Sequence, residues 1–468
     1  MDKGQGKMQN DNEFQLVLQK YEDMLKARRS YFFDVEEFEE IIDYYLDLRD
    51  YKHAYEAAEK ALRQHPGSYD LRVKLVHTQL ESGEADSALQ SLDKFAKYEK
   101  EDSDYFLLKG TALVSMSKFR EAEKVFDLAL EKTDGDSVDI YINISIAFEN
   151  ARQYNFALKY LRMANKSDPN NLSVLYDLGY YNERIQNFKA SIEYYNKYLD
   201  VDSYSENVWH NLGVIYTKIN DLPKAHECYD YAIAINLSYG LAYFNKAHIY
   251  ADENNYHEAI KVYEEFLKIE PENLQAWNFL GESYEELEDY NKALEIYKKL
   301  IEIDNTFADG WYGAGLSYMQ QEKLSEARTY ILKAIDFDRD NPEYWYTLGE
   351  IYSIQKLSGE AEKCFRQVCK LDPKDREAWI RLAFLYTEKN EFGDALIILQ
   401  KASSNNINSQ DILYIIAAVY FQLNDKKAGM KYLEKAVELG KGGIKLFYKV
   451  YPQGKNIKKI NNLIKSKS

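Results

Sequence analysis

Apolar residues in the middle of the chain recur at helical spacing and then pause. Within residues 205–239, Trp209, Leu212, Gly213 and Tyr216 lie at i, i+3, i+4 and i+7, which places them on one face of a helix. A short polar segment that ends in a proline interrupts the pattern, and a second apolar helical face follows it. The stretch therefore predicts two antiparallel helices joined by a tight turn. Neither helix can bury its apolar face alone.

The same pattern repeats along the chain at a fixed interval. Counted onward from Trp209, Tyr216 and Ala225, the equivalent positions carry an aromatic residue, a tyrosine and an alanine in five further repeats. These positions are Tyr243, Trp277, Trp311, Trp345 and Trp379; Tyr250, Tyr284, Tyr318, Tyr352 and Tyr386; and Ala259, Ala293, Ala327, Ala361 and Ala395. Such a fixed interval indicates a solenoid of stacked repeats instead of separate globular domains. We expect the repeated positions to pack against neighbouring helices, with Trp277 and Trp345 buried.

The motif W-x2-L-G-x2-Y occurs at residues 209–216 and 345–352, and an alanine follows it in the second helix. This motif resembles the first-helix signature of the tetratricopeptide repeat (TPR). The resemblance implies an all-α fold, an α-solenoid in which antiparallel helix pairs wind into a right-handed superhelix. About twelve repeats of about 34 residues occupy residues 35–443. One extra residue is placed near residues 134–136, in a turn where an insertion costs little.

The segments outside the repeats are expected to cover their ends. Residues 1–34 are expected to form an N-terminal tail, disordered up to residue 12, and a capping helix that includes Phe14. Asp34 and Glu37 have the spacing of a capping box at the start of the first repeat.

Residues 444–468 are expected to form a basic C-terminal capping helix or tail. From Lys441 onward the chain carries eight lysines and no acidic residue. Three interpretations stay open: a solvating cap on the last repeat, docking into the acidic groove of the same or another copy, and contact with an anionic surface such as RNA or lipid. A stripe of Ile457, Ile460 and Ile464 favours the cap.

The charge of the chain limits its partners. Lys+Arg 60 and Asp+Glu 77 give a formal net charge of −17. Such a surface repels phosphate backbones, which disfavours nucleic acid, and it attracts a basic protein or peptide partner. Three cysteines argue against a disulfide framework and fit a reducing compartment. With no apolar signal segment and no stretch long enough to span a bilayer, the sequence predicts a cytoplasmic protein.

Sequence motifs of catalysis are missing from the chain. The seven histidines are scattered without an H-E-x-x-H motif, and no phosphate loop, G-x-S-x-G or C-x-x-C is present. A metal held by His210 and His248 would lack an evident third ligand. We therefore expect no catalytic residue, no metal and no cofactor, and hence a protein that is not an enzyme.

The resemblance also implies where a partner would bind. In this family the first helix of each pair lines the concave side, and an asparagine two residues after the signature tryptophan often holds peptide backbone. That position carries Asn143, Asp177, Asn211 and Asn245 in four successive repeats. A side-chain amide offers both a donor and an acceptor, so it can hold an extended peptide of any sequence. The alternative is that asparagine is a common, solvated residue of the repeat.

Aromatic and acidic residues complete the candidate groove. They are Tyr176, Tyr180, His210, Phe244, His248 and Glu282. Exposed rings beside amides suit the binding of a partner, and glutamates suit a basic segment. The alternatives are local packing of the rings between first helices and an ordinary solvated helix face.

These observations favour a non-enzymatic protein–protein interaction scaffold that binds a partner peptide or segment in the concave groove. The alternative is an assembly or regulatory subunit, or a chaperone-like adaptor of a larger complex, that acts through its outer face and ends. A third hypothesis, RNA binding through the lysine-rich tail, is disfavoured by the net charge.

Overall fold

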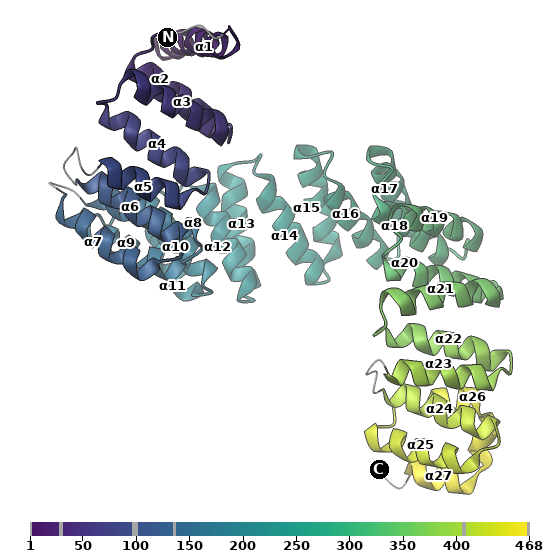
Figure 1. Cartoon of the computed structure of the whole chain (residues 1–468). Coiled ribbons are helices and arrows are strands. Elements are labelled where there is room, and N and C mark those ends of the chain that lie inside the picture. The colour runs from purple at the N-terminus through teal and green to yellow at the C-terminus, as the bar shows by residue number, and fades with distance from the viewer. Residues whose placement is uncertain (1, 28–30, 96–101, 134–136, 405–408, 466–468) are drawn as a thin grey trace. The chain divides into compact units, whose positions relative to one another are not determined.

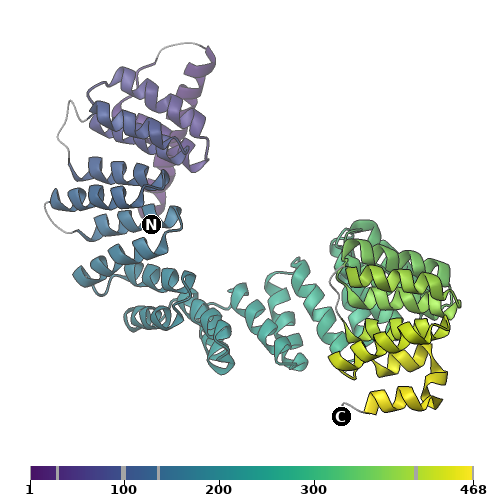
Figure 2. The same ribbon diagram turned by 60° about the horizontal axis from the view of Figure 1, so that its bottom comes forward.

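The computed structural model describes residues 2–27, 31–95, 102–133, 137–404 and 409–465. In these residues every regular element is a helix, as the sequence predicts. Contacts divide the chain into two compact units, Met1–Ile235 and Asn236–Ser468. Within each unit, antiparallel helix pairs stack one upon the next (Figures 1 and 2).

The first unit holds helix α1 (Asp2–Ala27) and six helix pairs. The pairs are α2 (Val35–Asp47) with α3 (Tyr51–Gln64), α4 (Tyr69–Glu81) with α5 (Ala85–Phe95), α6 (Ser103–Ser115) with α7 (Phe119–Glu131), α8 (Val138–Asn150) with α9 (Tyr154–Ser167), α10 (Leu172–Arg184) with α11 (Phe188–Val201), and α12 (Glu206–Lys218) with α13 (Leu222–Ile235). The starting points of the first helices are evenly spaced, except that the step from α6 to α8 is longer by a single residue. The extra residue falls between α7 and α8, and the predicted position at 134–136 lies outside the described residues.

The second unit continues with six further pairs and a short cap. The pairs are α14 (Gly240–Asp252) with α15 (Tyr256–Ile269), α16 (Leu274–Glu286) with α17 (Tyr290–Ile303), α18 (Ala308–Gln320) with α19 (Leu324–Phe337), α20 (Pro342–Ile354) with α21 (Ser358–Leu371), α22 (Arg376–Glu388) with α23 (Phe392–Ser404), and α24 (Gln410–Gln422) with α25 (Lys426–Leu439). The cap consists of α26 (Ile444–Val450), the 3₁₀ helix η1 (Pro452–Asn456) and α27 (Lys458–Lys465). Helix α26 begins a full repeat length after the start of α24, where a thirteenth first helix would begin.

Each of the twelve pairs is closed by the same turn, in which one residue has positive φ. The angle lies between 56° and 65° at eleven non-glycine residues, Asn220 and Glu288 among them, and it is 80° at Gly83. The next residue donates its backbone N–H to the carbonyl oxygen five residues earlier, as Asp289 does to Tyr284 at 2.9 Å. This Schellman arrangement ends a helix and satisfies its last carbonyl groups. Because only one of the twelve residues is glycine, glycine placement alone could not predict the turn.

The tryptophans form hydrogen bonds to the turns between repeats. Each indole Nε1 donates to a backbone carbonyl oxygen six residues earlier, at 2.8 to 3.0 Å. The acceptors are Ser203 for Trp209, Pro271 for Trp277, Asn305 for Trp311, Arg339 for Trp345 and Pro373 for Trp379. Trp277 is buried as expected, but the expectation for Trp345 is wrong. Trp345 is half-buried, although its indole makes the same bond as the buried indole of Trp277, over whose ring the Lys299 ammonium group lies at 4.2 Å.

Helix α1 covers the first repeat, with Tyr21 buried against Phe33 and Phe38 at ring-centroid distances of 5.8 and 6.4 Å. The helix begins at Asp2, whereas the sequence predicts disorder up to residue 12. No proline interrupts these residues, so the backbone continues in helix beyond the apolar stripe.

The start of the first repeat is capped as predicted. Asp34 Oδ1 accepts the Glu37 N–H at 2.8 Å, and Glu37 Oε2 accepts the Asp34 N–H at 2.9 Å. The capping box is therefore confirmed.

The C-terminal residues pack onto the last repeat. Helix α26 contacts α24 and α27 contacts α25. Phe447, Val450 and Ile460 are buried, which is the packing of a cap, and Lys445, Lys449, Lys455, Lys458 and Lys459 are exposed on its outside. None of the helices in the described residues is both long and apolar enough to cross a lipid bilayer.

Candidate functional site

In each unit, several neighbouring first helices contact each other across the boundary between repeats. Contacts join α2 to α4, α4 to α6 and α6 to α8 in the first unit, and α14 to α16 and α16 to α18 in the second. Among the described residues, second helices of successive full repeats make no comparable contacts. The first helices therefore form the inner side of the stack. We call the residues one, two and five positions after the tryptophan position the inner face.

Successive repeats touch each other along the inner face in a regular way. In one repeat, the contacting residue lies one position after the tryptophan position. In the next repeat, its partner lies two positions after the tryptophan position of that repeat. The contacts are Tyr176 with Asn211 (3.2 Å between Oη and Nδ2), Phe244 with Phe279 (6.0 Å between ring centroids), Tyr312 with Thr347 (3.1 Å between hydroxyl oxygens) and Tyr346 with Arg381 (3.2 Å between Oη and Nε). These contacts join α10 to α12 in the first unit, and α14 to α16, α18 to α20 and α20 to α22 in the second. A motif within one repeat does not predict them.

Asn211 lies inside this network in the first unit. Its side-chain N–H groups are directed at the hydroxyl oxygens of Tyr176, at 3.2 Å, and Tyr195, at 3.3 Å. Asn143, two repeats earlier on α8, is exposed. The four predicted asparagine-position residues are therefore not equivalent, since Asn211 joins two repeats while Asn143 faces solvent.

Asp177 faces a second carboxylate that the sequence analysis did not single out. Partial burial, and then the nearby Glu149, raise the pKa of Asp177 to about 6. Glu149 accepts a hydrogen bond from the Tyr181 hydroxyl at 2.6 Å. Glu149 of α8 lies eight residues after its tryptophan position, so it was not among the positions that the family resemblance marks.

Tyr180 and His210 are both half-buried in the first unit. Arg184 donates to the Tyr180 hydroxyl at 2.6 Å and lies over its ring. The His210 ring lies 5.8 Å from the Tyr229 ring, and burial lowers the pKa of the imidazole, although a hydrogen bond with Asn211 acts in the opposite direction. Each ring is thus held by packing in addition to its solvent contact.

An aromatic cluster forms the inner face at the start of the second unit. The Phe279 ring lies 6.0 Å from Phe244, 5.2 Å from His248 and 6.2 Å from Tyr263. Phe244 and Phe279 are half-buried and His248 is exposed. Tyr263 is buried, and its hydroxyl has no hydrogen-bond partner in the structure. Phe244 packs against Phe279 of the next first helix and keeps part of its ring exposed, and Asn245 beside it is half-buried.

Glu282 stands exposed beside this cluster. It accepts a hydrogen bond from the Asn278 amide at 2.7 Å. Desolvation of the carboxylate by the surrounding protein raises the pKa of Glu282, the bond from Asn278 lowers it, and the nearby Asp309 and Glu343 raise it again. The inner face here therefore combines aromatic rings with carboxylates that repel one another.

Glu285, one helical turn beyond Glu282, is enclosed more deeply. It accepts hydrogen bonds from the Ser317 hydroxyl at 2.7 Å and the Tyr297 hydroxyl at 3.0 Å. Burial raises the pKa of Glu285 to about 7, although both hydrogen bonds lower it. The Tyr297 ring fits closely against Gly313 of the next first helix, where a methyl carbon would lie 2.3 Å from the ring. Gly313 thus admits the tyrosine that holds the carboxyl.

Replacing Glu285 by glutamine is expected to change how stability depends on pH. The folded-state pKa of about 7 exceeds the ordinary value of 4.5, so the stability that this carboxyl contributes is full below about pH 4.5 and is lost as pH rises toward 7. Between pH 4.5 and 8 the wild type should lose about 2 kcal/mol of unfolding free energy relative to Glu285→Gln, allowing for solvent screening. Urea unfolding at several pH values checks this, with the exposed Glu326→Gln as control. Parallel pH profiles for wild type and Glu285→Gln would contradict it.

The described residues contain no group of three histidine, cysteine or acidic side chains that could hold a metal ion. Cys228, Cys364 and Cys369 are all buried, and burial raises the pKa of each thiol to about 12. A thiol protonated at neutral pH is a poor nucleophile, so these cysteines act as small core residues.

Three family models match the chain. Residues 240–445 match the model described as the cilia and flagella-associated protein 70 C-terminal domain. Residues 45–112 and residues 172–204 match two models of the tetratricopeptide repeat. No curated protein matches the chain in sequence.

Several solved structures align with parts of the chain. The MamA protein is 26% identical and aligns over 37% of this chain and 94% of its own, with a TM-score of 0.35. The C-terminal part of a TPR repeat-containing protein from Cytophaga hutchinsonii is 17% identical over 52% and 99% of the two chains, with a TM-score of 0.46. YrrB, described as a TPR protein with an unusual peptide-binding site, is 20% identical over 39% and 94%, with a TM-score of 0.34.

Proposed function

Because the chain belongs to the tetratricopeptide repeat family, we propose that it is a non-enzymatic scaffold that binds a segment of a partner protein on its inner face. In the second unit the contact residues are Phe244, His248, Phe279 and Glu282. The observation that carries the proposal is the exposed Glu282 carboxylate beside the aromatic rings of α14 and α16. Rings and a carboxylate side by side suit a segment that carries lysine or arginine next to apolar residues.

The electrostatics of this face support a basic segment. Glu282, Asp309 and Glu343 lie close enough for each of the other two to raise the pKa of Glu282. Further along, Glu350 is paired with Arg381 at 2.9 Å. A lysine or arginine of the partner would relieve the repulsion and lay its aliphatic stem on a ring. Because half-exposed ion pairs contribute only about 1 kcal/mol, the apolar contacts carry most of the affinity.

The inner face of the first unit is proposed as a second contact surface. Asn143 is exposed there, and Asp177 and Tyr180 are half-buried on α10. Asn211 and Tyr176 hold each other and support this surface from within. We keep His210, and Asn245 in the second unit, in the proposal as neighbours of these residues.

We place this activity in a cilium or flagellum. The basis is the match of residues 240–445 to a domain named for a cilia and flagella-associated protein. This refines the cytoplasmic location that the sequence predicts, and it makes a protein of the same compartment the expected partner.

A peptide-display selection tests the proposal on the full chain. Random ten-residue peptides are selected for binding, and the best peptide is then titrated by fluorescence anisotropy. We expect enrichment of lysine or arginine beside aromatic or aliphatic residues. Phe279→Ala and Glu282→Lys should each weaken the selected peptide at least about tenfold, which is about 1.4 kcal/mol.

A matched control is Glu326→Lys on the second helix α19, which changes the charge equally on an exposed position away from the inner face. All variants are compared by circular dichroism first. Selection of acidic peptides, or equal binding by wild type, Phe279→Ala and Glu282→Lys, would show that the inner face does not bind in this way.

A further inference from the structure

The charges of the chain are strongly separated along its length. Residues 426–468 contain twelve lysines and two glutamates, which is a net charge of +10. Because the whole chain carries −17, the part that precedes Lys426 carries −27. The most one-sided acidic segment is residues 34–47, with seven carboxylates and no basic residue. Two surfaces of opposite sign thus lie in different units of the same chain.

The basic surface is formed by Lys441, Lys445, Lys458 and Lys459, all of which are exposed on the cap. The cap orients them, because Phe447 and Ile460 are buried against the last repeat and leave the lysines outside. Leu439 beside them is 59% exposed. The surface therefore offers both positive charge and an apolar contact.

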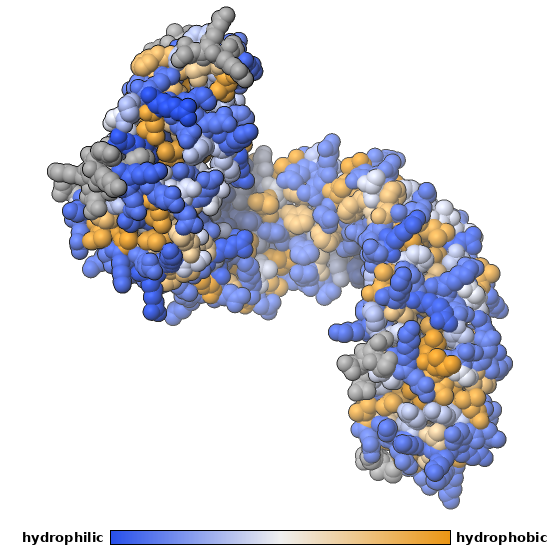
Figure 3. All heavy atoms as spheres, viewed as in Figure 1, coloured by the Kyte–Doolittle hydropathy of each residue, from blue (hydrophilic) through white to orange (hydrophobic). Residues whose placement is uncertain are grey.

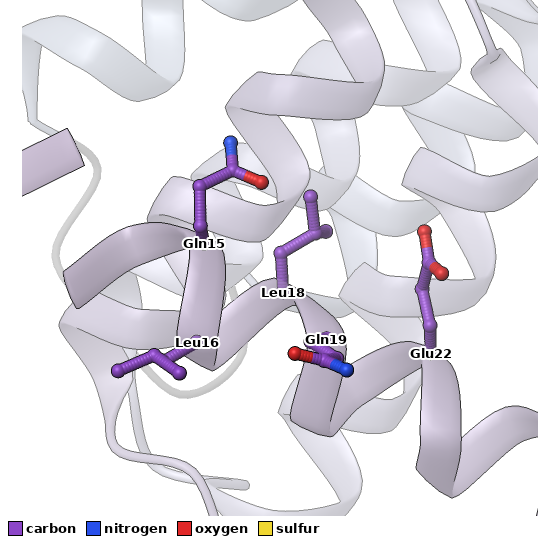
Figure 4. Close-up of a pocket in the computed structure, with 5 residues that line it drawn as sticks. All are labelled: Gln15, Leu16, Leu18, Gln19 and Glu22. Atoms are coloured by element: carbon purple, nitrogen blue, oxygen red, sulfur yellow. The ribbon is translucent and has the colours of Figure 1, made fainter. Parts of the chain in front are cut away.

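The acidic surface is formed by Glu36, Glu40 and Asp47 of α2, all of which are exposed. Three large apolar residues near it in the sequence are exposed: Phe32 just before α2 (67%), Leu48 at the end of α2 (60%) and Leu16 on α1 (67%). In α1, Leu16 projects from a different side of the helix than Gln15, Leu18 and Glu22, and all four side chains line a pocket together with Gln19 (Figure 4). Hydrophobic residues reach the surface near α1 and α2 and also near α24 and α25 (Figure 3).

We propose that the acidic surface of one copy of this chain binds the basic surface of a second copy. Opposite charge brings the surfaces together, and the exposed leucine and phenylalanine side chains supply the apolar contact that a phosphate backbone would not need. The two surfaces are different patches, so a bound pair keeps one unused acidic surface, on one copy, and one unused basic surface, on the other. Such a heterologous contact extends into an open chain of copies. The proposal does not depend on the inner face.

Sedimentation velocity of the full chain tests this association at about 30 mM and about 500 mM salt. One variant carries Glu36→Lys, Glu40→Lys and Asp47→Lys, and the other carries Lys441→Glu, Lys458→Glu and Lys459→Glu. We expect the wild type to form concentration-dependent larger species at low salt that dissociate at high salt. Each variant alone should associate at least about tenfold more weakly, and an equal mixture of the two should associate again because every reversed surface meets its complement.

Glu302→Lys with Glu326→Lys and Asp336→Lys is the matched control, since it makes the same charge change at exposed positions of α17 and α19. This control should associate as the wild type does. A wild type that stays monomeric at low salt, or a variant mixture that does not associate, overturns the proposal. A wild type that does not self-associate but binds a fluorescent 20-nucleotide RNA also overturns the proposal. If that binding is lost in the Lys441→Glu, Lys458→Glu, Lys459→Glu variant, the basic surface is assigned to nucleic acid.

Discussion

Replacing Trp379 by alanine is expected to destabilise the second unit by about 4 kcal/mol. Trp379 is 3% exposed and belongs to the largest buried cluster, which spans α21 to α27. Its indole also donates to the Pro373 carbonyl oxygen at 3.0 Å. Alanine would leave a cavity and free the turn between two repeats, so both effects act in one direction.

Hydrogen exchange measured peptide by peptide checks this prediction, because repeat arrays need not unfold in one step. The loss of protection should centre on α21 to α24. Trp311→Ala is the control: Trp311 makes the same kind of indole bond but is only half-buried. If both substitutions cost the same, burial is not what distinguishes these tryptophans and the prediction is wrong.

Two glycine-to-alanine substitutions are expected to act with opposite sign. At Gly281 a methyl carbon would lie 2.6 Å from the Tyr297 ring. The ring cannot move aside, because the backbone at Gly313 of the next repeat lies close to its other side. Gly281→Ala should therefore cost about 3 kcal/mol through overpacking.

At Gly359, near the start of α21, nothing lies within 4 Å of the added carbon. Gly359→Ala should therefore stabilise the helix by about 0.5 kcal/mol, through the better helix propensity of alanine. Thermal melting by circular dichroism, with hydrogen exchange of α16 to α18, compares the two variants. Equal effects would mean that the close approach of Tyr297 to Gly281 does not limit packing.

The repeat was predictable because the same residue types recur along the chain at a fixed interval. Trp209 and its equivalents, the tyrosines seven positions later and the alanines of the second helices gave the helix pairs and their starting points. The capping box at Asp34 was predictable for the same reason, since both partners lie within one turn. The positive-φ turns were not predictable, because eleven of the twelve are made by residues other than glycine.

The candidate site was only partly predictable, because its contacts cross from one repeat to the next. The family resemblance implied that Phe244, His248 and Glu282 lie on one face, and the structure brings their elements α14 and α16 together. It did not reveal that Asn211 is held by Tyr176 or that Ser317 and Tyr297 enclose Glu285. These contacts depend on how two repeats stack, and a motif within one repeat does not describe stacking.

The central claim is that partners bind on the inner face of the second unit, and photo-crosslinking in ciliated cells tests it most directly. A photoreactive benzoylphenylalanine is placed at Phe279 on the inner face or, in a second variant, at the exposed Glu295 on α17. We predict that illumination attaches a partner protein to the variant at position 279 and not to the variant at position 295. Attachment at 295 with none at 279 would contradict the account, because the partner would then lie on the second helices.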